Sequence, residues 1–109
     1  MEFIETTAFT KYVYDYLSDD EYLGLQSFLL QYPELGKVVP GSGGVRKVRW
    51  AMTGKGKSGG VRVIYYFMVR PDLVFLADIY TKNEKENLTH AERNQLKKIA
   101  SEIQQEFGG

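Results

Sequence analysis

The feature that most constrains the fold is the segment VRVIYYFMV, residues 61–69, in which every position but one is apolar and most are β-branched or aromatic. This composition predicts a central β-strand that is buried on both faces. Residues 45–51 alternate in polarity, and residues 73–80 are again rich in strand-forming side chains. The connections between these three segments are short, which predicts that neighbouring strands are antiparallel.

Apolar residues recur at helical spacing in two segments that meet at Ser18. Ser18 and Glu21 have the spacing of a capping box, so one helix is expected to end here and a second to begin. Thr89 and Glu92 repeat the pattern ahead of another apolar stripe, which predicts a C-terminal helix to about residue 107.

The order of the expected elements predicts the fold class. Residues 1–5 alternate apolar and acidic side chains, as in an edge strand. Two helices, about three strands and a last helix follow. This order predicts an α+β fold, a small antiparallel sheet with two N-terminal helices and a C-terminal helix, all on one side of the sheet. A length of 109 residues without a repeat or linker predicts one domain, residues 1–109.

Charge is strongly segregated although the net charge is zero. Residues 1–36 contain seven acids and one base, residues 37–70 contain eight bases and no acid, and residues 71–109 contain five bases and seven acids. A polyanion responds to the local field rather than to the overall balance. The middle segment therefore predicts a polyanion-binding surface.

Several function classes are excluded or disfavoured by what the sequence lacks. Without cysteine there is no disulfide and no thiolate metal site. The single histidine, His90, excludes a nuclease that works through paired histidines, and the basic segment has no carboxylate to hold a catalytic metal. No apolar run approaches the ~20 residues that span a bilayer. We therefore expect a cytoplasmic protein with no metal, no cofactor and no membrane partner.

The segment GKGKS, residues 54–58, has the ending of a phosphate-binding P-loop. The complete pattern needs a glycine where this chain has Ala51, and it needs a helix directly after the serine. Two more glycines and the expected central strand follow instead. We therefore interpret the segment as a basic hairpin loop and not as a nucleotide site.

Arg62 lies one residue into the most apolar strand, where a charge is rarely tolerated unless it is paired or functional. Two interpretations stay open, an ion pair with Asp78 on the next strand or a guanidinium that donates to a phosphate. Lys47 and Arg49 share one face of their strand by the two-residue period, and Arg46 belongs to the other face.

These segments together resemble the RelE/ParE superfamily of toxins from bacterial toxin–antitoxin pairs, and most closely the HigB-type branch of RelE-like mRNA endonucleases. The resemblance rests on YPELG (32–36), GSGGVRKVR (41–49), GKGKSGGVRVIYYF (54–67) and IYTKNE (79–84). It implies the α+β fold described above, metal-independent cleavage of mRNA in the ribosomal A site, and silencing by a cognate antitoxin.

The resemblance also implies positions for the functional residues. The cations that the family places on one strand correspond to Lys47 and Arg49, and its central-strand arginine corresponds to Arg62. A basic residue at the exit of the last strand corresponds to Lys82 or Asn83. Some relatives use a tyrosine near the C-terminal helix, but this chain has leucine there.

The implied chemistry is attack of a ribose 2′-OH on the adjacent phosphate. Arginine stays charged and suits the transition-state phosphate, so Arg62 is assigned to charge stabilisation. Without paired histidines or a metal, lysine or tyrosine must carry the protons, and the base is not fixed among them. The candidate catalytic residues are therefore Arg62, Lys57, Lys82 and Tyr80, and the candidate RNA-binding residues are Arg46, Lys47, Arg49, Lys55 and Asn83.

Two alternatives remain open at the level of sequence. The ParE branch shares the fold but acts on DNA gyrase, so a fold alone does not assign a ribonuclease. A non-catalytic RNA-binding module would also use a cationic face. In the toxin interpretation the expected partners are the ribosome, mRNA and an antitoxin, which we expect to be a small helix-turn-helix DNA-binding protein.

Overall fold

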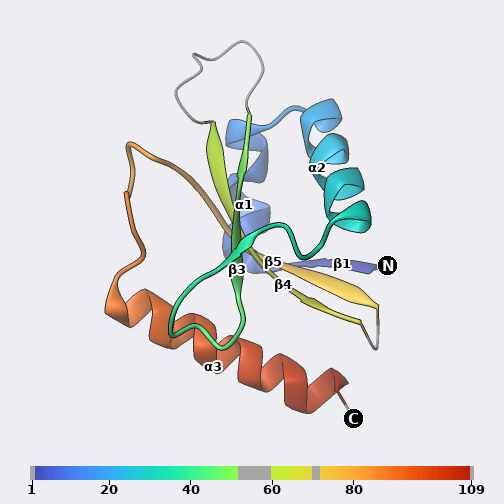
Figure 1. Ribbon diagram of the computed structural model, residues 1–109. Helices are drawn as coiled ribbons and strands as arrows, with labels where there is room; N and C mark the ends of the chain where they lie inside the picture. The colour runs from blue at the N-terminus through green and yellow to red at the C-terminus, as the bar shows by residue number, and fades with distance from the viewer. Residues whose placement is uncertain (1, 52–59, 70–71, 109) are drawn as a thin grey trace.

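The computed structural model describes residues 2–51, 60–69 and 72–108. The expected α+β class is confirmed, with three helices and a five-stranded sheet (Figure 1). Along the chain the elements are β1 (Glu2–Glu5), α1 (Thr7–Tyr16), α2 (Asp19–Gln31), β2 (Lys37–Val38), β3 (Arg46–Trp50), β4 (Val61–Met68), β5 (Leu73–Thr81) and α3 (His90–Phe107).

The sheet has the strand order β1-β5-β4-β3-β2, so β4 is the central strand, as its apolar sequence predicts. The β2–β3, β3–β4 and β4–β5 pairs are antiparallel. The prediction of a wholly antiparallel sheet is wrong at one edge, because β1 pairs parallel with β5. Short connections enforce antiparallel pairing only between consecutive strands, and β1 reaches β5 through the rest of the chain.

The helices cover both faces of the sheet, so the expectation that they all lie on one side is wrong. Side chains of α1 and α2, including Phe9, Val13 and Leu25, pack against one face of β4 and β5. On the other face Leu96 and Ala100 of α3 pack in one cluster with side chains of β4 and β5. Figure 1 shows α3 separated from α1 and α2 by the strands. A strand that is apolar on both sides requires this two-sided cover.

Both predicted capping boxes are confirmed. The Ser18 hydroxyl accepts from the Glu21 N–H at 3.1 Å, and the Glu21 carboxylate accepts from the Ser18 N–H at 2.8 Å. Thr89 and Glu92 form the same pair of hydrogen bonds where α3 begins. In the described part of the chain no helix has the length and apolar character needed to cross a bilayer.

Tyr65 of β4 anchors the connection between α2 and β2. Its ring is fully buried, and its hydroxyl donates to the Pro33 carbonyl at 2.6 Å and accepts from the Gly36 N–H at 3.1 Å. A Cβ at Gly36 would lie 2.5 Å from the Tyr65 hydroxyl, so only glycine fits there without a shift. Because Lys37 follows Gly36 directly, this contact also fixes where β2 begins.

We expect Tyr65→Phe to lower the free energy of unfolding by about 1–3 kcal/mol, because it leaves a buried N–H and a partly buried carbonyl without a partner. Urea denaturation measures the change. The matched control is Tyr66→Phe, which removes an exposed hydrogen bond of 3.3 Å from the Tyr66 hydroxyl to Gln104. This variant should change the free energy of unfolding by less than about 0.5 kcal/mol. Equal losses in the two variants would contradict the anchoring role.

Candidate functional site

A cavity of about 440 Å³ lies where β2, β3 and β4 run side by side. Strand register brings its cations together, because Lys37 on β2 is opposite Lys47 on β3, and Arg49 on β3 is opposite Arg62 on β4. Residues directly opposite in an antiparallel pair share a face and have neighbouring side chains. The described lining residues are Leu35, Gly36, Lys37, Lys47, Val48, Arg49, Arg62 and Glu86.

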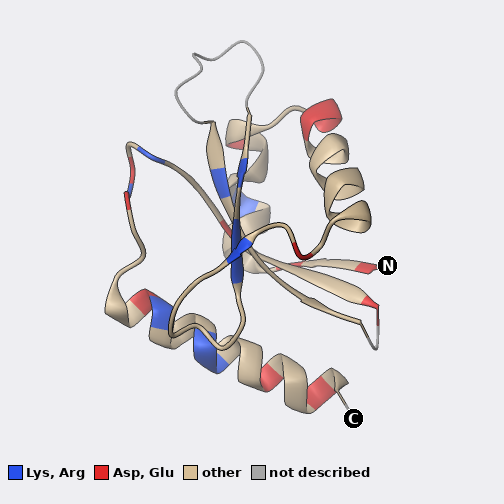
Figure 2. Ribbon diagram, viewed as in Figure 1, with Lys and Arg blue, Asp and Glu red and all other residues tan. Residues whose placement is uncertain are grey.

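The cavity concentrates positive charge on one surface. Figure 2 shows Lys and Arg positions along β3 and beside them on β4. Like charges directly opposite each other on paired strands are unfavourable, and both the Lys37–Lys47 and the Arg49–Arg62 pair have this geometry. An anion with several negative oxygens relieves that repulsion and is held by several donors at once. The cavity is therefore suited to phosphate groups.

Arg46 lies on the opposite face of β3, as the two-residue period predicts, and is not among the residues that line the cavity. Its Nη1 donates to the carbonyl oxygens of Glu34 and Gly36, both at 2.8 Å. Its guanidinium lies 5.5 Å from the centre of the Phe67 ring. These contacts give Arg46 a structural role in holding the α2–β2 connection.

Tyr80 of β5 is opposite Arg62 in the sheet register but is only 3% exposed. Its hydroxyl is buried and has no hydrogen-bond partner among the described residues. Burial raises the pKa of Tyr80, so the phenol holds its proton more firmly than in water. The structure thus places the candidate Tyr80 beneath the surface and not among the described residues that line the cavity.

Lys82 and Asn83 are exposed in the turn after β5, and neither is among the described residues that line the cavity. Glu84 fixes this turn, because its carboxylate accepts from the Thr81 N–H at 2.8 Å and from the Tyr16 hydroxyl at 2.5 Å. The hydrogen bond from Tyr16 lowers the pKa of Glu84, while burial and this same carboxylate raise the pKa of Tyr16. The candidates Lys55 and Lys57 lie outside the described residues.

The sequence left open an ion pair between Arg62 and Asp78. In the sheet Asp78 lies opposite Ile64, and Lys85 forms an ion pair with Asp78 at 3.7 Å. Burial raises the pKa of Asp78, against the opposing effects of a backbone N–H and of Lys85. Lys85 also contacts Glu92 at 2.5 Å and lies 4.9 Å from the centre of the Tyr80 ring. These contacts tie the β5–α3 connection to the sheet.

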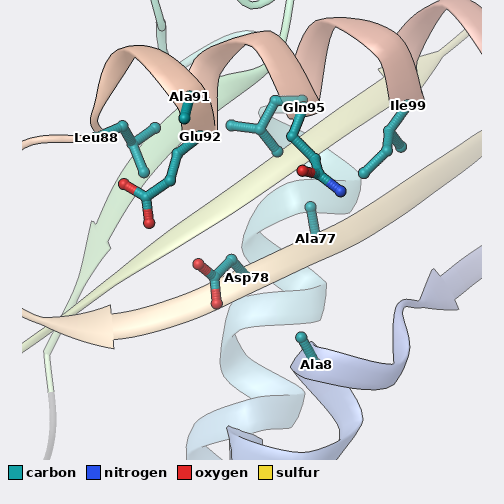
Figure 3. A pocket seen from close by; sticks show the side chains of 9 residues that line it. Ala8, Ala77, Asp78, Leu88, Ala91, Glu92, Gln95 and Ile99 are labelled. Carbon is teal, nitrogen blue, oxygen red and sulfur yellow. The ribbon is translucent and has the colours of Figure 1, made fainter.

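A second cavity of about 300 Å³ lies between α3 and β5 (Figure 3). Its walls are mostly aliphatic, and the charged side chains that Figure 3 labels there, Asp78 and Glu92, are both acidic. Those two carboxylates are the partners of Lys85. Among the described residues that line it, this cavity therefore has no cation of the kind that a phosphate site requires.

Two residues of the basic cavity were not singled out from the sequence. Lys37 lies on a strand of two residues, too short for a periodic signal, and only its pairing with Lys47 brings it into the cavity. Glu86 lies in the connection between β5 and α3, where side-chain direction follows no repeat. The excess of bases from residue 37 onward was the only sequence signal for Lys37, and none pointed to Glu86.

The fold and the cavity together define a small α+β protein that presents clustered cations at the meeting of three strands. The chain belongs to the RelE toxin family. A model of that family, described as the RelE toxin of the RelE / RelB toxin-antitoxin system, matches residues 37–107. The matched region holds all four cations among the described residues that line the cavity. The protein is accordingly a toxin of the toxin–antitoxin kind, with a cognate antitoxin as its partner.

Within the described residues, no group of three or more His, Cys, Asp or Glu side chains could hold a metal ion. The charged groups among the described lining residues of the cavity are four cations and Glu86.

The ion pair of Glu92 with Lys85 predicts a pH-dependent stability. The Lys85 hydrogen bond holds the pKa of Glu92 below its ordinary value of 4.5. A lowered carboxylate pKa contributes stability above the unfolded-state value, and the contribution is lost as the pH falls through the folded-state value. Glu92→Gln keeps an oxygen for the capping box but removes the charge that pairs with Lys85, so it should be less stable than wild type at neutral pH.

This stability gap should close as the pH falls to about 3, and urea denaturation at the two pH values measures it. Glu102→Gln, on the exposed side of α3, is the control and should differ little from wild type at neutral pH. A gap for Glu92→Gln that stays constant from neutral to acidic pH would mean that the ion pair contributes nothing.

Proposed function

We propose that this toxin is a ribosome-dependent endoribonuclease of the HigB type, which cuts mRNA in the A site without a metal and so inhibits translation. The observation that carries the proposal is the convergence of Lys37, Lys47, Arg49 and Arg62 on one cavity in a member of the RelE family. Such a cluster suits the phosphates of a nucleic-acid strand and the extra charge that develops during phosphate cleavage.

In the proposed reaction a ribose 2′-OH attacks the adjacent phosphate. Arg62 lies at the start of the central strand, and its guanidinium donates to the phosphate oxygens as negative charge builds up. Lys37, Lys47 and Arg49 hold the neighbouring phosphates and fix the position of the strand. Lys82 and Asn83 at the exit of β5, with Lys55 and Lys57, remain proposed contacts for the mRNA beyond the cavity.

The antitoxin is proposed to be a small helix-turn-helix DNA-binding protein with an acidic segment that covers the basic cavity. A surface with this charge binds polyanions without discrimination, so a complementary segment both shields it and associates rapidly. Besides the complex with the antitoxin, we propose a complex of the toxin with the ribosome, in which the ribosome presents the mRNA.

Mapping the 5′ ends of mRNA after brief expression of the toxin tests the proposed activity. New 5′ ends at fixed positions within translated codons support A-site cleavage. Intact mRNA together with inhibited DNA gyrase would instead identify the ParE-type activity, and intact mRNA with bound RNA would identify a non-catalytic binder.

We expect Arg62→Ala to lower the cleavage rate by ~10²–10³, because one preorganised donor to the transition state is lost. Growth inhibition on expression should be lost with it, while circular dichroism and urea denaturation confirm a folded protein. Lys98→Ala, an exposed basic position on α3, is the matched control and should remain toxic. A folded and fully toxic Arg62→Ala variant would remove Arg62 from the mechanism.

We expect the double variant Lys47→Gln, Arg49→Gln to bind single-stranded RNA more weakly at low salt. Each lost phosphate contact should flatten the slope of log K against log salt by roughly 0.7. Fluorescence anisotropy of a labelled RNA oligonucleotide across a salt series measures the slope. The control pair Lys97→Gln, Lys98→Gln removes the same number of positive charges, but from α3. An equal change of slope in both double variants would show that only the overall charge matters.

A further inference from the structure

Glu86 is the one carboxylate among the described residues that line the basic cavity. The other charged residues there are the cations Lys37, Lys47, Arg49 and Arg62. A negative charge among them weakens the attraction of the cavity for phosphate, so Glu86 does not contribute to RNA affinity. Its presence requires another explanation.

The backbone on either side of Glu86 is anchored, so the position of the carboxylate is set by the fold. The preceding residue, Lys85, contacts Glu92 at 2.5 Å and Asp78 at 3.7 Å. On the other side Leu88 is buried, and its carbonyl accepts from Arg93 at 2.9 Å. An exposed side chain between two such anchors is presented to the cavity with little freedom of the main chain.

Attack by a 2′-OH needs a group that accepts its proton, and the described lining residues offer few choices. An ammonium group such as that of Lys37 or Lys47 has three donors and no acceptor. Tyr80 is buried with a raised pKa, and His90 begins α3 and is not among the described lining residues. An ionised carboxylate is acceptor-only, which leaves Glu86 as the acceptor that the described part of the cavity provides.

Building on the proposed ribonuclease function, we propose that Glu86 is the general base of the reaction. Its carboxylate takes the proton of the 2′-OH, the 2′ oxygen bonds to phosphorus, and the bond from phosphorus to the 5′ oxygen breaks. The leaving 5′ oxygen takes a proton from water, and the hydroxide that remains takes the proton from Glu86, which restores the carboxylate. The products are a 2′,3′-cyclic phosphate and a 5′-hydroxyl end, and no oxidant or metal is consumed.

Single-turnover cleavage of mRNA on purified ribosomes tests this role. We expect Glu86→Ala and Glu86→Gln to lower the maximal rate by ~10²–10⁴, the usual contribution of a positioned base, with KM little changed. Added formate should restore part of the activity of Glu86→Ala, because the space left by the side chain can admit a small carboxylate. It should not restore Glu86→Gln, in which the side chain still fills that space.

Two controls make the result specific. Glu102→Ala, an exposed glutamate on α3, should cut at the wild-type rate, and Arg62→Ala with formate should stay slow because it lacks a cation rather than a base. Full activity of Glu86→Ala, a loss confined to KM, or a loss that formate leaves unchanged each overturns the assignment. A wild-type protein that cuts no ribosome-bound mRNA refutes the proposed function as well, so the two failures are distinguishable.

Discussion

Burial of β4 on both faces is the constraint on which the other elements depend. Val61, Val63 and Tyr65 face the cluster formed with α1 and α2, while Ile64 belongs to the cluster under α3. Neither helix layer could be removed without exposing one side of this strand to water. The same strand carries Arg62 as its second residue, so the site is built on a deeply buried element of the sheet. A rigid support of this kind is what a preorganised cationic site requires.

The strands and helices that the sequence predicted are those with a strong local signal. The capping boxes at Ser18 and Thr89 and the apolar period of the helices depend on neighbouring residues alone. The parallel pairing of β1 and the two-sided helix cover depend on contacts between distant segments, and no local pattern encodes them. For the site, the period of two separated Arg46 from Lys47 correctly, whereas Lys37 and Glu86 enter the cavity only through tertiary structure.

Opposite charges serve different purposes in two neighbouring parts of the molecule. Around Lys85 the acids Asp78 and Glu92 neutralise a cation and fix the connection that leads into α3. In the cavity the described lining holds four cations and one carboxylate, so its net charge is positive and attracts a polyanion. Salt should weaken the exposed interactions of both kinds, but only the second kind controls encounter with a polyanion. Membership of the RelE family accords with this division between a scaffold and a charged recognition surface.

The pairing of β1 with β5 has a consequence for the order in which the chain can fold during its own synthesis. Thr6, just after β1, donates to the carbonyl of Ala77, 71 residues later. At a typical rate of 5–20 residues per second, roughly 4–14 s pass before β1 has a partner. Before β4 and β5 have been synthesised, α1 and α2 have no strands to cover, and the nascent chain exposes their apolar sides. The sheet is therefore completed only once β5 has been synthesised.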